Sequence, residues 1–204
     1  MKFYESGDSS KPVIFLFPGT CCLYSSFDHI LDRLHPYFYT VTVSYDGFDP
    51  NEKTEFYSME DECEKIEQEI KKKYDGRIKA AYGCSLGGSF VSLLIQRKRI
   101  HIDHGIIGSS DMDEAGHLVA KIKSSMVVPF MYKMIHTGAL PKFMQKKLNK
   151  TDEVKKELYN GFLNMFGIGK GGNPWITKQS IYNQFYSDLV TKVQHGIDVP
   201  GTTI

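Results

Sequence analysis

Short apolar runs recur along the first half of the chain, separated by stretches that have a different period. Val13–Phe17 is apolar at every position and is followed by Pro18-Gly19, which is typical of a strand buried on both faces of a sheet. Residues 39–45 are β-branched and aromatic, and two shorter apolar runs cover 78–82 and 102–107. These four segments predict four strands.

The segments between these strands place apolar residues at helical spacing. This period predicts helices over residues 25–34, 59–74 and 89–96. Ser58 and Asp61 form a capping-box pattern at the start of the second helix, which a glycine ends. Repeated strand–helix–strand units predict an α/β fold, with a mostly parallel sheet flanked by helices.

Residues 114–195 have no convincing strand pattern. They predict three or four helices broken at prolines and glycines, the first of which is Pro129. The charge changes at the same place, from a net −5 over residues 1–113 to a net +7 over residues 114–195. We therefore expect a core over 1–113, a helical cap over 114–195, and the start of a further core strand over 196–204.

Composition excludes several classes of protein. The 204 residues are 41% hydrophobic and 24% charged, which does not fit a disordered or fibrous chain. The formal net charge of +1 gives no support for a nucleic-acid partner. No apolar run approaches the roughly 18 residues of a spanning helix, so we expect no stable membrane insertion. The N-terminus lacks an apolar signal core, and four cysteines do not make a disulfide scaffold, so we expect reduced thiols and a cytoplasmic location.

The stretch that carries chemistry is Gly83-Cys84-Ser85-Leu86-Gly87. A G-x-S-x-G pattern between an apolar strand and an apolar helix indicates a nucleophile elbow, a sharp strand-to-helix turn with a strained central residue. The two glycines let the strand end and the helix start approach closely. Ser85 is therefore the predicted nucleophile, and the Leu86 backbone N–H at the helix N-terminus is a predicted oxyanion donor.

A second oxyanion donor is expected from the loop that follows an earlier strand, where Thr20 comes after Pro18-Gly19. With these motifs, residues 1 to about 113 resemble the α/β-hydrolase fold family, and residues 114–195 resemble the helical cap of many members. Pro18 stands where the family has a histidine, which leaves the backbone donor intact. The resemblance implies a serine hydrolase acting on a small-molecule acyl substrate, with no metal and no organic cofactor.

The family's triad needs an acid and then a histidine after the serine. Asp111, which follows the run 102–107, and His195, the last histidine, satisfy this order within the chain. The family, however, usually places both groups after later strands. We therefore interpret the 204 residues as a truncated piece of a longer gene product or, alternatively, as a degenerate member that has lost catalysis.

The predicted function is cleavage of an ester or a related acyl substrate by Ser85. Two alternatives stay open: a non-catalytic binding or interaction protein on the same scaffold, and an acyltransferase or thioesterase that uses the same serine. The sequence does not specify an oligomeric state. The cap has a basic face that is compatible with an acidic substrate or an anionic membrane surface, but we interpret it as a solvated lysine face. It consists of Lys142, Lys146, Lys147 and Lys150.

Overall fold

The computed structural model describes residues 1–110, 114–150, 152–168, 171–194 and 196–204. Its strands form one sheet in the order β1-β3-β2-β4-β5. The edge strand β1 runs antiparallel to β3, and the other neighbours are parallel. The strands are β1 (Lys2–Ser6), β2 (Val13–Phe17), β3 (Tyr39–Ser44), β4 (Arg77–Cys84) and β5 (His101–Gly108).

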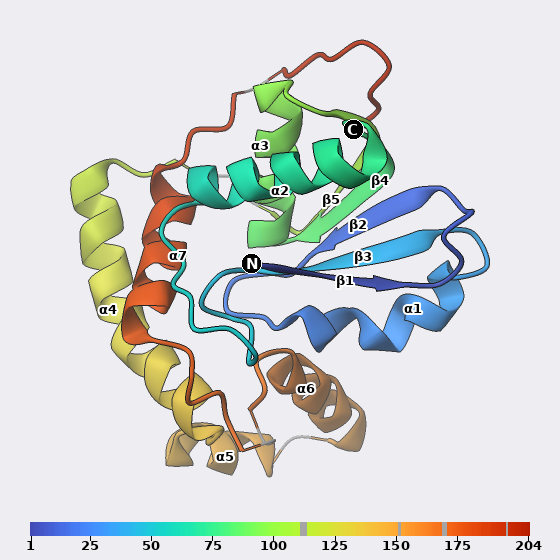
Figure 1. Ribbon diagram of the computed structural model, residues 1–204. Helices are drawn as coiled ribbons and strands as arrows, with labels where there is room; N and C mark the ends of the chain where they lie inside the picture. Colours follow the sequence, from blue (N-terminus) through green and yellow to red (C-terminus); the bar gives the residue numbers. More distant parts are fainter. Residues whose placement is uncertain (111–113, 151, 169–170, 195) are drawn as a thin grey trace.

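Helices cover both faces of this sheet, which confirms the predicted α/β fold (Figure 1). The short 3-10 helix η1 and α1 lie on one face, and α2 and α3 lie on the other. The helices α4 to α7 follow β5 and gather beside the sheet. The bounds are η1 (Tyr24–Phe27), α1 (Asp28–Leu34), α2 (Met59–Tyr74), α3 (Leu86–Arg97), α4 (His117–Thr137), α5 (Lys142–Leu148), α6 (Glu153–Met165) and α7 (Lys178–Val190).

Strand β2 explains why its sequence is apolar without interruption. Phe15 and Phe17 lie in the core on the side of α2 and α3, whereas Ile14 and Leu16 pack with the apolar residues of α1. Successive side chains of a strand point to opposite faces. Each side chain of this central strand therefore meets a layer of helices.

Helix α2 begins and ends as its sequence indicates. The Ser58 hydroxyl oxygen accepts a hydrogen bond from the Asp61 N–H at 3.1 Å, which satisfies one of the free donors of the first turn. The C-cap Asp75 has a φ of 52° and Gly76 one of 74°. Two successive residues in the left-handed region end the helix and turn the chain into β4.

The expected break at Pro129 is wrong, because α4 continues through this residue. A proline removes one backbone hydrogen bond and places its ring against the preceding turn. Both Ser125 and Pro129 are exposed, so water can hydrate the Ser125 carbonyl group, which loses its partner.

None of the helices in the described ranges is both long and apolar enough to cross a bilayer.

Two segments tie the later part of the chain to the sheet layer. In α7, the Ser180 hydroxyl accepts from the Phe56 N–H at 3.2 Å, and the Ser187 hydroxyl accepts from the Met59 N–H at 2.8 Å. Thr203 forms a parallel bridge with His104 at the outer edge of β5. The proposed boundaries at residues 113 and 195 therefore separate segments that stay in contact.

Candidate active site

Ser85 is the single residue between β4 and α3. Its backbone has φ 54° and ψ −124°, a region that residues with a Cβ rarely adopt. The Ser85 N–H donates to the Gly108 carbonyl of β5 at 2.8 Å, and the Ser85 carbonyl accepts from the Gly88 N–H at 2.8 Å. These bonds hold the backbone on both sides of the turn in the strained form.

The two glycines of the G-x-S-x-G pattern are required by close backbone contacts. A Cβ on Gly83 would lie 2.0 Å from the Gly87 carbonyl oxygen, and one on Gly87 would lie 2.1 Å from the Phe17 carbonyl oxygen. Both neighbours are backbone atoms of packed elements, so they have little freedom to shift. The glycines at positions 83 and 87 therefore let β4, α3 and β2 approach one another closely next to Ser85.

The Ser85 side chain is exposed. In the part of the chain that the structure describes, no group forms a hydrogen bond with its hydroxyl, so the oxygen is open to a substrate or a base. The loop after β2 lies directly against it, because a Cβ on Gly19 would be 3.6 Å from the Ser85 Cβ. The sharp turn thus presents a hydroxyl next to a backbone loop.

The predicted oxyanion donors belong to the two segments that meet at Ser85. Thr20 follows Gly19 in the adjacent loop, and Leu86 is the first residue of α3. Within the described residues, the backbone N–H groups of Thr20 and Leu86 donate no hydrogen bond. Both donors are therefore available, and the N-terminus of α3 adds a positive partial charge that favours an anion.

Two side chains from distant parts of the chain hold the loop that carries Thr20. The Tyr45 hydroxyl donates to the Pro18 carbonyl at 3.1 Å. The buried Gln184 of α7 accepts from the Cys21 N–H through its Oε1 at 2.6 Å. Gln184 lies 163 residues from Cys21 in the sequence and belongs to no local motif, so no sequence pattern predicts its place in the site.

The buried thiols of Cys21 and Cys22 are poor nucleophiles. Burial raises the pKa of Cys22 to about 12, and the nearby Cys84 adds to this effect. Burial also raises the pKa of Cys21 well above its ordinary value. Because the thiolate is the reactive form, both groups stay protonated and inert near neutral pH. Ser85, in contrast, is exposed at the turn.

The predicted acid Asp111 lies outside the described residues and stays a prediction. The residue before it, Ser110, has its Oγ 3.2 Å from the Ser89 Oγ in the first turn of α3. A Cβ on Gly88 would lie 2.7 Å from the Ser110 Cβ. Ser110, the last described residue before position 111, therefore contacts the first turn of α3, which begins directly after Ser85.

The predicted base His195 also lies outside the described residues and stays a prediction. Its neighbour Gln194 donates its N–H to Oε1 of Gln96 at 2.6 Å. Gln96 is in α3, and eleven residues separate it from Ser85 in the sequence, which corresponds to about 16 Å along a helix. The described residue before position 195 therefore contacts α3 near the end of the helix that is far from Ser85.

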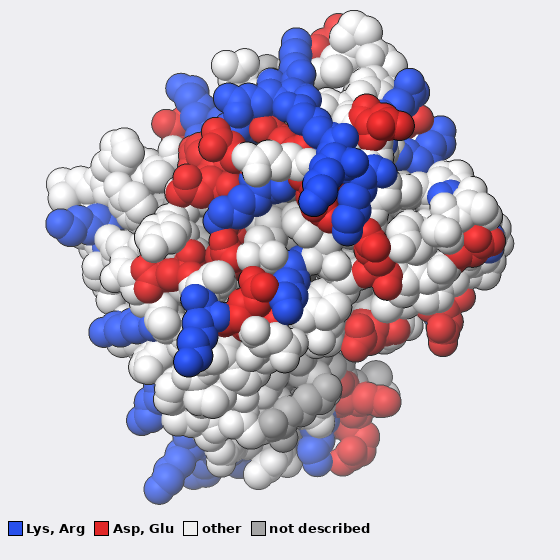
Figure 2. All heavy atoms as spheres, in the orientation of Figure 1, with Lys and Arg blue, Asp and Glu red and all other residues white. Residues whose placement is uncertain are grey.

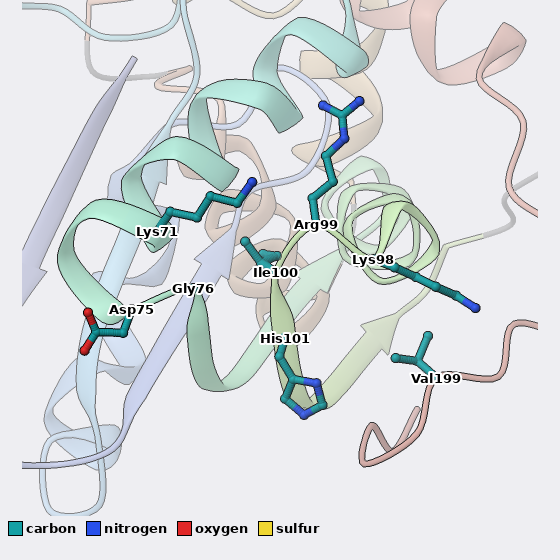
Figure 3. A pocket seen from close by; sticks show the side chains of 8 residues that line it. All are labelled: Lys71, Asp75, Gly76, Lys98, Arg99, Ile100, His101 and Val199. Carbon is teal, nitrogen blue, oxygen red and sulfur yellow. The ribbon is translucent and has the colours of Figure 1, made fainter.

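Two cavities lie away from the Ser85 hydroxyl. One of 620 Å³ is lined by Lys71, Lys98, Arg99 and His101 where α2 and α3 end and β5 begins, at the opposite end of the strands from Ser85. Its side chains point in different directions rather than toward one point (Figure 3). Arg99 is paired with Glu64 and Glu67, and these cations offset the negative ends of the helix dipoles.

The other cavity, of 680 Å³, lies between the start of α1 and α6. Val154, Leu158 and Met165 supply apolar surface, and Ser26 contributes a buried hydroxyl. The Leu23 N–H donates to the Met165 carbonyl at 3.1 Å, which ties this side of α6 to the segment just after Thr20. An apolar space beside that loop suits the acyl part of a substrate.

Similar solved structures share this architecture. A protein assigned to the α/β hydrolase family from Desulfitobacterium hafniense is 14% identical, with a TM-score of 0.71, and the match covers 93% of this chain and 72% of that one. An enol-lactonase from Burkholderia xenovorans is 12% identical, with a TM-score of 0.64 and coverages of 94% and 71%. For a thermophilic esterase from Thermogutta terrifontis the values are 14%, 0.66, 93% and 67%.

These likenesses define the class of fold. The chain has the α/β-hydrolase fold, so the resemblance based on the elbow and the oxyanion loop is confirmed at that level. The chain spans about 67–72% of the length of these three proteins. No protein-family model matches the sequence, and no curated protein sequence matches it. A shared fold does not by itself assign a reaction.

Proposed function

We propose that this protein is a serine hydrolase that cleaves an ester or a related small-molecule acyl substrate. The observation that carries the proposal is the strained, exposed Ser85 at a strand-to-helix turn, with φ 54° and ψ −124°. Such strain is retained where the surrounding structure enforces it and where it serves function. The similar structures include an esterase and an enol-lactonase, which is compatible with acyl chemistry here.

In the proposed reaction, Ser85 Oγ bonds to the substrate carbonyl carbon and gives up its proton to a base. The carbonyl oxygen becomes an oxyanion that the N–H groups of Thr20 and Leu86 stabilise. The bond to the leaving alcohol then breaks as the alcohol takes the proton, and water releases the acid from Ser85. Asp111 and His195 are the proposed acid and base. No step draws on a metal or an organic cofactor.

The proposal also places the protein in the cytoplasm. All four cysteines lie within the described ranges and are free thiols, which fits a reducing compartment.

The 680 Å³ cavity beside α6 is the proposed site for the acyl group.

Hydrolysis of a series of p-nitrophenyl esters tests the role of Ser85. We expect Ser85→Ala to lower kcat by about 10³-fold or more, because the covalent step needs the hydroxyl group. Ser125→Ala, a substitution of an exposed serine in α4, is the matched control and should leave kcat unchanged. Retained activity in Ser85→Ala rules out this nucleophile. Asp111→Asn and His195→Gln each test a proposed partner in the same assay.

A second candidate is a non-catalytic binding protein on the same scaffold. It is favoured by the 680 Å³ cavity beside α6, which can hold a ligand whether or not Ser85 reacts. A protein of this kind binds esters without turnover, so calorimetry with a slow ester substrate separates it from the hydrolase. An acyltransferase or thioesterase would use the same serine, and added alcohols or thioester substrates distinguish these reactions from ester hydrolysis.

A further inference from the structure

Helix α4 is apolar on two sides, and only one of them is covered. Ala120, Ser124, Val128 and Ile135 are buried, and they recur at the spacing of a single helix face. This face packs along α7, and Figure 1 shows α4 at the margin of the molecule, with α7 between it and the sheet. The outer side of α4 therefore faces away from the rest of the chain.

The outer side carries a stripe of large apolar residues. Leu118 is 72% exposed, Ile122 53%, Met126 75% and Phe130 42%. They follow one another at intervals of four residues, so they form one ridge about 18 Å long. The exposed side chains of Val119 and Val127 widen it. We call these six residues the outer stripe.

The outer stripe is too apolar for an ordinary solvated helix face. A surface helix normally turns charged or polar residues outward, and a helix that is apolar all round is normally buried. In α2 the exposed positions are glutamates, lysines and other polar residues. A contiguous exposed apolar patch marks a place where the protein meets a partner or a membrane.

Charge around the outer stripe specifies what that partner is. Helix α4 contains Lys121, Lys123 and Lys133 but no aspartate or glutamate. At 100° per residue, Lys121 and Lys123 fall on opposite flanks of the stripe, and both are exposed. Among the described ion pairs, none uses these three lysines. Figure 2 shows basic side chains along the margin where α4 and α5 lie.

We propose that the outer stripe of α4 lies against an anionic lipid surface. The apolar ridge would enter the boundary between headgroups and acyl chains, while the flanking lysines reach the anionic headgroups with their long side chains. A second copy of the chain is a poor occupant, because it would bring its own unpaired lysines against these lysines. This inference concerns attachment at one face and does not depend on the role of Ser85.

Vesicle co-sedimentation of the full chain tests the proposal. We expect binding to vesicles of phosphatidylcholine with phosphatidylserine, and weaker binding to phosphatidylcholine alone or at high salt, because exposed charges are screened. Leu118→Ser with Met126→Ser should reduce the partition coefficient by about tenfold or more, since two large apolar side chains no longer enter the lipid. Lys121→Glu with Lys123→Glu should remove the preference for phosphatidylserine.

The matched control is Val154→Ser with Leu158→Ser on α6. These residues are 77% and 78% exposed, so this variant removes a similar apolar surface outside α4 and should bind vesicles like the wild type. Circular dichroism verifies that each variant is folded. Absence of wild-type binding to either vesicle, or equal losses in the α4 and α6 variants, overturns the proposal. A dimer in solution that only Leu118→Ser with Met126→Ser dissociates would instead show that a second copy covers the stripe.

Discussion

At the scale of single residues, Ser85 shows how the chain gives up stability to expose a hydroxyl group. A residue with a Cβ at a positive φ is strained by roughly 1–3 kcal/mol, and Ser85 has a φ of 54°. Its backbone bonds to Gly108 and Gly88 maintain this conformation. Glycine adopts the same conformation without this strain. A serine at this position is therefore not explained by the turn alone.

Glycine and alanine at position 85 separate this strain from the loss of the hydroxyl. We expect Ser85→Gly to have a free energy of unfolding about 1–3 kcal/mol higher than Ser85→Ala, as measured by urea denaturation. The order should reverse at the exposed Ser125 within α4, where alanine is favoured by about 1 kcal/mol. Equal stabilities of the two variants at position 85 contradict the strained conformation.

The residues of the site differ in how well the sequence reveals them. Ser85 was predictable because close backbone contacts around its turn require glycines at fixed positions on either side. Thr20 could be proposed because a Pro-Gly turn ends the apolar strand before it. Gln184 could not be found, because its bond to the Cys21 N–H depends on how α7 packs rather than on any local pattern.

At the scale of elements, the G-x-S-x-G turn joins three elements of the core. Gly83 lies near the end of β4, beside Gly87 of α3, and Gly87 in turn lies against Phe17 at the end of β2. The absence of two side chains thus sets how closely α3 approaches the sheet. Since Ser85 is carried by this junction, its exposure depends on both glycines.

Alanine substitutions at glycines test this junction. Gly87→Ala places a Cβ 2.1 Å from the Phe17 carbonyl oxygen, and we expect a loss of about 3 kcal/mol or more in the free energy of unfolding. In Gly161→Ala of α6 the new Cβ meets nothing within 4 Å, so this control should gain up to about 1 kcal/mol in helix propensity. Equal effects of both substitutions in thermal unfolding would contradict the described packing.

The elements themselves followed largely from the sequence. Strand β2 was predictable because burial on both faces selects an unbroken apolar run, as Phe15 and Leu16 show. Strands β3 to β5 were predictable from β-branched and aromatic residues or from shorter apolar runs. Continuation of α4 through Pro129 was not predictable, because it depends on which side of the helix is exposed. The outer stripe was likewise hidden, since a sequence does not show which of two apolar faces is covered.

At the scale of the whole molecule, a buried charge cluster ties α2 to the end of β3. Glu62 is buried, receives a hydrogen bond from the Asp46 N–H at 3.0 Å and pairs with Lys65 at 2.8 Å. Burial raises the pKa of Glu62 to about 7, the charge of Asp46 adds to the rise, and Lys65 opposes it. The folded protein therefore holds a proton on this carboxyl at a pH where the unfolded chain has released it.

This linkage makes stability depend on pH with a definite sign. Because the pKa of Glu62 is raised on folding, its contribution to stability is fully present below the ordinary value of 4.5 and is lost as pH rises through about 7. Relative to Glu62→Gln, which does not titrate, the wild type should gain free energy of unfolding as pH falls from about 8 to about 5. Urea denaturation across this range measures the difference. A wild type whose free energy of unfolding instead falls relative to that of Glu62→Gln as pH decreases would contradict the raised pKa.

The central claim is that Ser85 is the nucleophile of an acyl-cleaving enzyme, and its most direct test is covalent. A fluorophosphonate reacts with an activated serine, and peptide mapping by mass spectrometry locates the adduct. The account predicts one adduct on Ser85 in the folded protein and none in Ser85→Ala. A folded protein that stays unlabelled, or one labelled at another residue, would contradict it.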